Sequence, residues 1–312
     1  MRKIHVLISM DVEPVLPAGR PPASTGPLNY VDSERFIRAY AALAAAHGFP
    51  VSFMIHPEVT HEHAALFDEL EAEGACLGLH LHPWKFSDGR YRAHFGGLSA
   101  QLQCAIVSEA VAMWQAGMGR RPKYFRPGTF SANDATFSVL DTLGFVGGSC
   151  SLPGRVYPEM NAIWAGAPYD PHRAHADFRH VSGDLDFVNI PLSVDTSRQE
   201  VRDGNLFHWD LRPDWQSADY RLVATNIVAQ TLARDPAVPV VHMVTHNDND
   251  FSDLGDRVGR NFKTVLREIE DACRRAGAEP VGATFASVCD LVRNRDRPTR
   301  EFLYAHGSML SG

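Results

Sequence analysis

The sequence lacks several features that would assign it to common protein classes. No apolar run in its 312 residues reaches the ~20 residues that span a bilayer, and residues 3–10 begin a strand without the regions of a secretory signal. The net charge is -7 without a block of like charges, which argues against a nucleic-acid surface. The five cysteines are odd in number and scattered, which favours buried free thiols in a reducing compartment over a disulfide framework. We therefore expect a cytoplasmic protein with no membrane span and no nucleic-acid partner.

Apolar runs typical of buried strands alternate with segments of helical periodicity. The expected strands are 3–10, 50–56, 75–82, 123–128, a fifth that starts with 144–146 and leads into 149–151, 187–194 and 238–245, with a closing strand and helix within 281–292. The expected helices are 33–47, 61–73, 99–117, 133–143, 217–233 and 259–277. Such alternation is typical of parallel α/β architectures.

One large domain is favoured over two, because 45% of the residues are hydrophobic and α/β barrels commonly need about 250 residues. We expect this domain to cover 1–295, followed by a C-terminal tail at 296–312. The stretch from about 152 to 186 interrupts the alternation after the fifth strand and is rich in Pro, Gly, His and aromatic residues. It predicts an insertion that forms a wall over a pocket.

Two histidines alternate in the segment Gly78-Leu79-His80-Leu81-His82-Pro83-Trp84. Residues two apart on a strand share a face, so His80 and His82 present two imidazoles where the strand opens into a loop. Imidazole is the commonest protein ligand of zinc-like metals, and catalytic zinc usually takes three protein ligands and a water. An isolated His-x-His pair is more often two solvated loop residues, so its interpretation depends on the residues at the other strand ends.

Polar side chains also follow the other expected strands. They are Asp11 and Glu13, then Arg126, then His246 with Asp248. In parallel barrels the loops after the strands form the active site at the C-terminal face, so these residues are expected to converge there. Acids, histidines and an arginine in one pocket suit metal-assisted hydrolysis, in which a metal activates water, a carboxylate removes its proton and a histidine protonates the leaving amine.

These segments resemble the motifs of the polysaccharide deacetylase (NodB-homology, carbohydrate esterase family 4) superfamily over roughly 1–290. The matching pieces are Ser-Met-Asp-Val-Glu, Gly-Leu-His-Leu-His-Pro, Phe-Arg-Pro-Gly and Val-Val-His-Met-Val-Thr-His. The resemblance implies an irregular (β/α)7 barrel and a metal-dependent hydrolase that acts on amide C–N bonds or esters. The expected substrate is an acylated sugar or a sugar-linked small molecule that loses an acetyl or formyl group.

The resemblance also implies a role for each site residue. The implied catalytic residues are Asp11 as general base, Arg126 as the group that orients it, and His246 as general acid. The implied metal ligands are Glu13, His80 and His82, and the implied cofactor is a divalent transition metal, with Zn²⁺ the first expectation and other metals of this series left open.

The first motif departs from the common family pattern of adjacent aspartates. Here Val12 separates Asp11 from Glu13. Branches with an Asp-Val-Asp arrangement include lipid-linked sugar deformylases and some cyclic-amide hydrolases. The departure therefore points to an unusual branch of the superfamily.

The second motif also departs from the family pattern, which is usually His-x-x-x-His. Its second histidine would fall on Trp84, so His80 and His82 must supply both ligands by strand geometry. Either could be replaced by His56 or His246, which also lie at expected strand ends. The histidines that complete the metal site thus stay open at the level of sequence.

Several further residues have both a functional and a structural interpretation. Four loop aromatics could stack on a sugar ring or cover the core: Trp84, Phe86, Tyr91 and Phe95. Trp209 and Trp215 could form a wall of the pocket or simply pack in the protein interior. Asp248 or Asp250 could hold His246 in one tautomer or belong to a polar loop, and His242 is expected to be an interior histidine.

Two other functions remain as alternatives to sugar deacylation. One is a metal-dependent amidohydrolase acting on a non-sugar amide. Complete TIM-barrel amidohydrolases place His-x-His on the first strand, where this chain has Asp-Val-Glu, so the position of the pair argues against a complete TIM barrel of that kind. The other is a catalytically inactive, sugar-binding barrel, against which the retention of Asp11, Arg126 and His246 argues.

Overall fold

The computed structural model describes residues 1–15, 26–86, 90–202 and 204–295. The expected tail, 296–312, lies outside this part of the chain. The strands of the main sheet are β1 (Arg2–Val12), β2 (Val51–Ile55), β3 (Cys76–Leu81), β4 (Tyr124–Pro127), β5 (Gly147–Gly148), β8 (His172–Arg173), β9 (Val188–Asn189), β12 (Val240–His246) and β13 (Ala278–Gly282). The helices are α1 (Tyr30–Ala45), α2 (Thr60–Ala72), α3 (Ala100–Met118), α4 (Thr136–Thr142), α5 (Tyr220–Arg234), α6 (Arg257–Arg275) and α7 (Phe285–Arg295), with 3₁₀ helices η1 (Pro57–Val59), η3 (Phe95–Gly97), η4 (Gly128–Phe130) and η5 (Pro158–Met160).

The centre of the sheet is β1, which is buried along most of its length. Strands that are buried on both faces read as continuous apolar runs, as 4–10 does. β1 pairs in parallel with β12 on one edge and with β13 and then β2 on the other. The strand order is β12-β1-β2-β3-β4-β5-β9-β8, parallel throughout except between β8 and β9.

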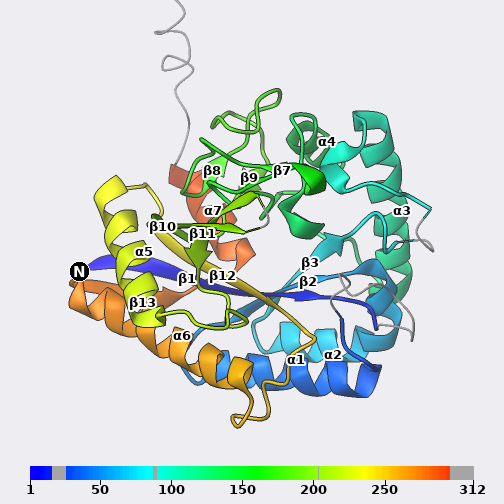
Figure 1. Ribbon diagram of the computed structural model, residues 1–312. Helices are drawn as coiled ribbons and strands as arrows, with labels where there is room; N and C mark the ends of the chain where they lie inside the picture. The colour runs from blue at the N-terminus through cyan, green and yellow to red at the C-terminus, as the bar shows by residue number, and fades with distance from the viewer. Residues whose placement is uncertain (16–25, 87–89, 203, 296–312) are drawn as a thin grey trace, which may run out of the picture.

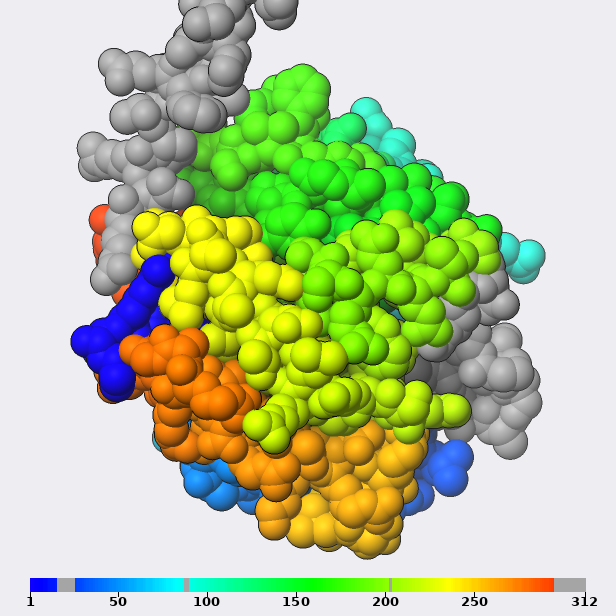
Figure 2. Space-filling model, turned by 60° about the vertical axis from the view of Figure 1, so that its left-hand side comes forward, coloured from blue at the N-terminus to red at the C-terminus, as the bar shows by residue number. Residues whose placement is uncertain are grey.

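Helices cover the outside of this curled sheet (Figure 1). α6 shows why: its buried apolar residues Val258, Phe262, Val265, Leu266 and Ile269 recur at helical spacing and form one stripe toward the core. α5 and α6 adjoin as the yellow and orange surfaces of Figure 2. Within the described residues the edge strands β12 and β8 do not pair, so the sheet forms a half-barrel. The predicted α/β barrel type is confirmed.

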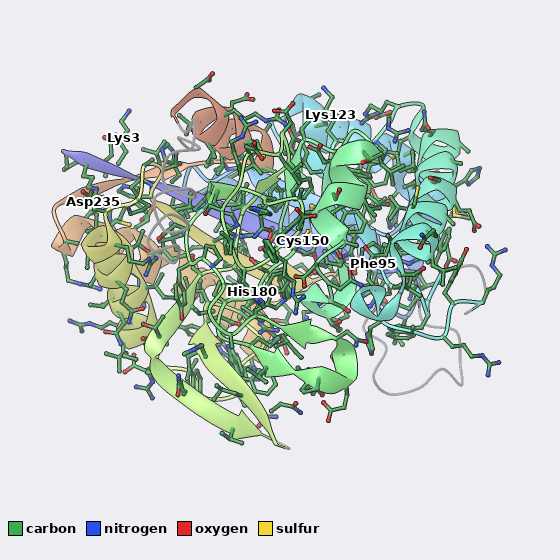
Figure 3. All side chains as sticks on the ribbon, turned by 90° about the horizontal axis from the view of Figure 1, so that it is seen from above. Lys3, Phe95, Lys123, Cys150, His180 and Asp235 are labelled. Carbon is green, nitrogen blue, oxygen red and sulfur yellow. The ribbon has the colours of Figure 1, made fainter. Side chains whose placement is uncertain are left out.

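The first part of the insertion and the segment that follows β9 together form a small antiparallel sheet. Its strands are β10 (Val194–Arg202), β11 (Asn205–Asp210), β6 (Val156–Tyr157) and β7 (Ala162–Ile163), in the order β10-β11-β6-β7. This sheet projects to one side of the barrel in Figure 3. The β10–β11 hairpin was not predicted, because its register shifts between Asp195 and Gln199 and disturbs the alternation that marks a strand.

Three sequence expectations are corrected. The fifth strand is shorter than expected, because it starts at Gly147 rather than at 144 and ends at Gly148, and the expected strand 187–194 is reduced to two residues as β9. Pro191 explains the second difference, because it has no N–H for a ladder and its carbonyl instead meets His242 Nδ1 at 3.0 Å. The first helix starts at Tyr30 rather than at 33, because the Asn29 side chain accepts from the Asp32 N–H at 2.8 Å.

Two expectations from composition can be compared with the structure. None of the helices in the described ranges is long and apolar enough to cross a membrane. All five cysteines are free, and four of them are buried, namely Cys76, Cys150, Cys273 and Cys289.

Candidate active site

The carboxyl ends of the strands meet on one side of the sheet. Asp11 on β1 lies beside His246 on β12, and His80 on β3 lies beside Arg126 on β4. Lys3, at the amino end of β1, and Asp235, which precedes β12, lie near each other at one side of the molecule in Figure 3. The convergence predicted from sequence is therefore present, because parallel strands present all their carboxyl ends at one edge.

Asp11 is held by a buried arginine. Arg126 is fully buried, and its Nη1 donates to Asp11 Oδ1 at 2.5 Å while its Nη2 donates to Ser9 Oγ at 2.9 Å. His242 Nε2 lies 3.0 Å from the same Nη2, which makes it an acceptor. The Nδ1–H of His242 can then donate to Pro191 O at 3.0 Å, so His242 is an interior histidine with satisfied hydrogen bonds.

The charge on Arg126 decides the ionisation of Asp11. Burial alone favours the neutral acid, but the positive charge of Arg126, with His80 and His246, lowers the pKa of Asp11 below its usual value. Asp11 is therefore a carboxylate at neutral pH, fixed in one orientation by Arg126.

Three candidate metal ligands converge beside Asp11. Glu13 Oε1 lies 3.3 Å from His80 Nε2 and 2.9 Å from His82 Nε2, and one ligand atom from each residue falls within 4.8 Å of the others. His80 Nδ1 lies 3.1 Å from Arg126 O, so a donor N–H there leaves Nε2 free to bind a metal. The donor set and its directions fit a divalent transition metal.

The orientation of Glu13 depends on residues from distant parts of the chain. The Glu13 N–H donates to Asn247 Oδ1 at 2.8 Å, and Asn247 Nδ2 donates back to Glu13 O at 3.2 Å. Lys85 Nζ lies 2.9 Å from Glu13 Oε2, so Oε1 alone faces the two histidines. Lys85 is buried, and sequence reasoning missed it because a lone lysine in a loop carries no periodic signal.

The ring of His82 is packed on a glycine. A Cβ at Gly128 would lie less than 3.0 Å from the Nδ1, Cε1 and Cγ atoms of His82. Trp84 lies edge-on to the same ring, with centroids 5.4 Å apart. Glycine at position 128 therefore leaves the room that the His82 ring occupies.

The two alternative histidines behave differently. His56 is buried after β2, but its Nδ1 accepts from the Glu58 N–H at 3.4 Å and it is not part of the compact ligand group. His246 lies beside Asp11 on the adjacent strand and lines the cavity described next. Within the described residues its ring makes no hydrogen bond with Asp248 or Asp250, whose side chains bond to neighbouring residues instead.

A cavity of about 530 Å³ opens above these residues. Its lining comprises Asp11, His82, Trp84, Lys85, Arg92, Ala93, His94, Thr129, Phe130, Arg155, Tyr157, Met160, Arg212, Val244 and His246. The volume lies in the range of small-molecule sites. The insertion contributes Arg155, Tyr157 and Met160, which sequence reasoning did not single out.

The aromatic candidates divide between cavity and core. Trp84 lines the cavity, whereas Phe86 and Phe95 are fully buried. Trp209 and Trp215 lie with centroids 5.0 Å apart beside a second hollow of about 650 Å³. Arg212 lines both hollows.

No family model and no curated protein matches the sequence. Among solved structures, a "putative polysaccharide deacetylase" from Mycobacterium smegmatis is 13% identical, with a TM-score of 0.52 over 96% of this chain and 95% of that one. A "putative glycoside hydrolase/deacetylase" from Parabacteroides distasonis is 13% identical, with a TM-score of 0.62 over 95% of this chain and 72% of that one. PuuE allantoinase is 11% identical, with a TM-score of 0.56 over 95% and 92%. The chain therefore has the fold of the polysaccharide deacetylase superfamily.

Proposed function

We propose that this protein is a metal-dependent hydrolase that removes an N- or O-acyl group, acetyl or formyl, from a carbohydrate or a sugar-linked compound. The observation that carries the proposal is the Glu13, His80 and His82 group beside Asp11, which Arg126 holds. His82 and Asp11 line the cavity. The descriptions of two solved structures with this fold support it.

Each group of residues has a separate proposed role in hydrolysis. Glu13, His80 and His82 would hold a divalent metal, most simply Zn²⁺, which would supply activation of water and polarisation of the acyl carbonyl. Asp11, ionised and oriented by Arg126, takes the proton of the attacking water. His246, on the adjacent strand and lining the same cavity, gives a proton to the leaving amine or alcohol.

A non-sugar amide is the second candidate substrate. The likeness in fold to PuuE allantoinase favours this class. For an N-acyl sugar the two candidates share the reaction, cleavage of an acyl C–N bond, and differ in whether the leaving group is a sugar amine.

The cellular setting is proposed on chemical grounds. Five free cysteines, four of them buried, suit a reducing compartment such as the cytoplasm. A small acylated sugar or sugar-linked precursor there would suit the size of the cavity.

The test is metal analysis of the purified protein followed by turnover. We expect about one equivalent of divalent transition metal in the wild type and none in His80→Ala/His82→Ala. A matched control is His61→Ala/His175→Ala, which removes two histidines outside the group and should keep the metal. Failure of the wild type to bind metal, even with excess zinc, would overturn the proposal.

Asp11→Asn then separates binding from chemistry. As the proposed general base, Asp11 should be needed for release of acetate or formate from N-acylated sugars but not for metal content. A variant that keeps both metal and full turnover would remove Asp11 from the mechanism.

A further inference from the structure

The cavity carries more positive than negative charge. Its lining holds the cations Lys85, Arg92, Arg155 and Arg212, against one carboxylate, Asp11. Asp11 is already paired with Arg126, Lys85 with Glu13 and Arg212 with Asp210. These carboxylates therefore do not neutralise the two remaining arginines of the lining, Arg92 and Arg155.

Arg155 is a buried guanidinium without a carboxylate partner in the described chain. It is 6% exposed, its Nη1 donates to Thr129 O at 3.0 Å, and its Nε makes no hydrogen bond with any described group. The rings of Phe130 and Phe207 lie 5.7 and 5.6 Å from its Cζ. Burying a charge without a counter-ion is costly, so a binding role would account for its position.

The carboxylate whose charge acts on Arg155 is Asp210, which is already paired with Arg212. Asp210 receives Arg212 Nε at 3.0 Å and Nη2 at 2.5 Å, and it also accepts from Trp215 Nε1 at 2.8 Å. Burial, together with the charge of Arg212, lowers the pKa of Arg155, but an arginine stays protonated at neutral pH. The uncompensated positive charge therefore faces the cavity.

The anchor for Arg155 is itself unusual. Thr129, whose carbonyl accepts from Arg155, has φ +57°, a left-handed conformation that β-branched residues rarely adopt. Such strain persists only where the surroundings hold it, and it clusters at ligand sites. A second arginine, Arg92, also lines the cavity. Its side chain is exposed and forms no ion pair within the described residues.

Resting on the proposed hydrolase function, we infer that the substrate carries an anionic oxygen group, a carboxylate or a phosphate, apart from the acyl group that is cleaved. Arg155 binds this group from the insertion, and Arg92 adds a second cation at the exposed side of the cavity. Guanidinium groups suit both anions, because their planar fork matches two oxygens of a carboxylate or phosphate. A neutral sugar would leave Arg155 without a partner.

The experiment measures binding by isothermal titration calorimetry with four probes: N-acetylglucosamine, N-acetylglucosamine 6-phosphate, N-acetylmuramic acid and inorganic phosphate. Wild type should bind at least one anionic sugar more tightly than the neutral one, and the two anionic sugars distinguish phosphate from carboxylate. Arg155→Gln should reduce this preference about 10- to 150-fold, the range of a charged hydrogen bond, and Arg155→Lys should retain part of it.

Two further variants guard against a folding artefact. Arg92→Gln changes an exposed side chain that forms no ion pair with the residues the structure describes, so the fold should persist while the preference falls. Arg90→Gln, whose arginine pairs with Glu109 and does not line the cavity, should leave the preference unchanged.

The outcomes separate this inference from the proposed function. Equal binding of neutral and anionic sugars, a preference that survives both Arg155→Gln and Arg92→Gln, or no binding of any anionic probe would overturn it. A charge-dependent preference without hydrolysis of any sugar would support the anion site and contradict the deacylase proposal.

Discussion

Gly128 packs directly against the ring of His82, and we expect Gly128→Ala to displace that ring. Gly128 is not among the residues with positive φ, so alanine suits its backbone and the effect comes from the new methyl group alone. This methyl would lie less than 3.0 Å from three ring atoms, where ordinary contacts are about 3.5–4.0 Å. The ring must therefore move by about 0.5 Å or more, beyond the ~0.2 Å that ligand distances in a metal site tolerate.

The ring has little room to move. His82 is 6% exposed and is flanked by His80, with centroids 4.8 Å apart, and by Trp84. Overpacking of this kind costs about 1–3 kcal/mol of stability. A displaced ligand should also weaken zinc binding by about 10- to 100-fold, as loss of a supporting contact typically does.

The assay is a double-mutant cycle in urea unfolding. Gly128→Ala should destabilise the wild type by about 1–3 kcal/mol but cost almost nothing in the His82→Ala background, where the methyl group fills vacated space. Zinc titration of Gly128→Ala gives the second readout. Equal losses of stability in the two backgrounds, or unchanged zinc affinity in Gly128→Ala, would refute the reasoning.

Two further predictions concern buried ion pairs. Arg126→Gln leaves the Asp11 carboxylate buried without its counter-ion and should cost about 3–5 kcal/mol in urea unfolding, whereas Arg38→Gln, in a surface pair with Glu34, should cost less than about 1 kcal/mol. Burial by itself raises the pKa of Asp210, but the charge of Arg212 outweighs burial, and the pKa in the folded protein is lowered. The pair therefore stabilises the fold at pH values above the pKa of an unfolded aspartate, about 3.9. This contribution is lost as the pH falls from there through the lower pKa of the folded state. The stability difference between wild type and Asp210→Asn should therefore narrow as unfolding is measured from pH 6 down to pH 3; a constant difference would contradict it.

The position of the site could be predicted from local patterns in the sequence. A strand has a period of two residues, so His80 and His82 had to share a face, and the structure places both Nε2 atoms on Glu13 Oε1. Parallel strands end at one edge, so Asp11, Arg126 and the histidines were expected together before any contact was known. The roles of these residues in catalysis stay predictions.

Only the tertiary structure decided which groups complete the site. Lys85 reaches Glu13 from a loop, Arg155 enters the cavity from the insertion, and His56 stays outside the ligand group although it also follows a strand. None of these placements has a periodic signal, because a loop side chain is directed by the surfaces that it packs against.

The same division applies to the fold. Apolar periodicity determined the alternation of strands and helices and hence the parallel sheet, because burial on both faces leaves a continuous apolar run. The open half-barrel depended on which strands far apart in the sequence pair with one another. The β10–β11 hairpin depended on a pairing whose register is irregular. Sequence thus determined which residues stand at the strand ends, while packing between distant segments decided which charges surround them and what the cavity can bind.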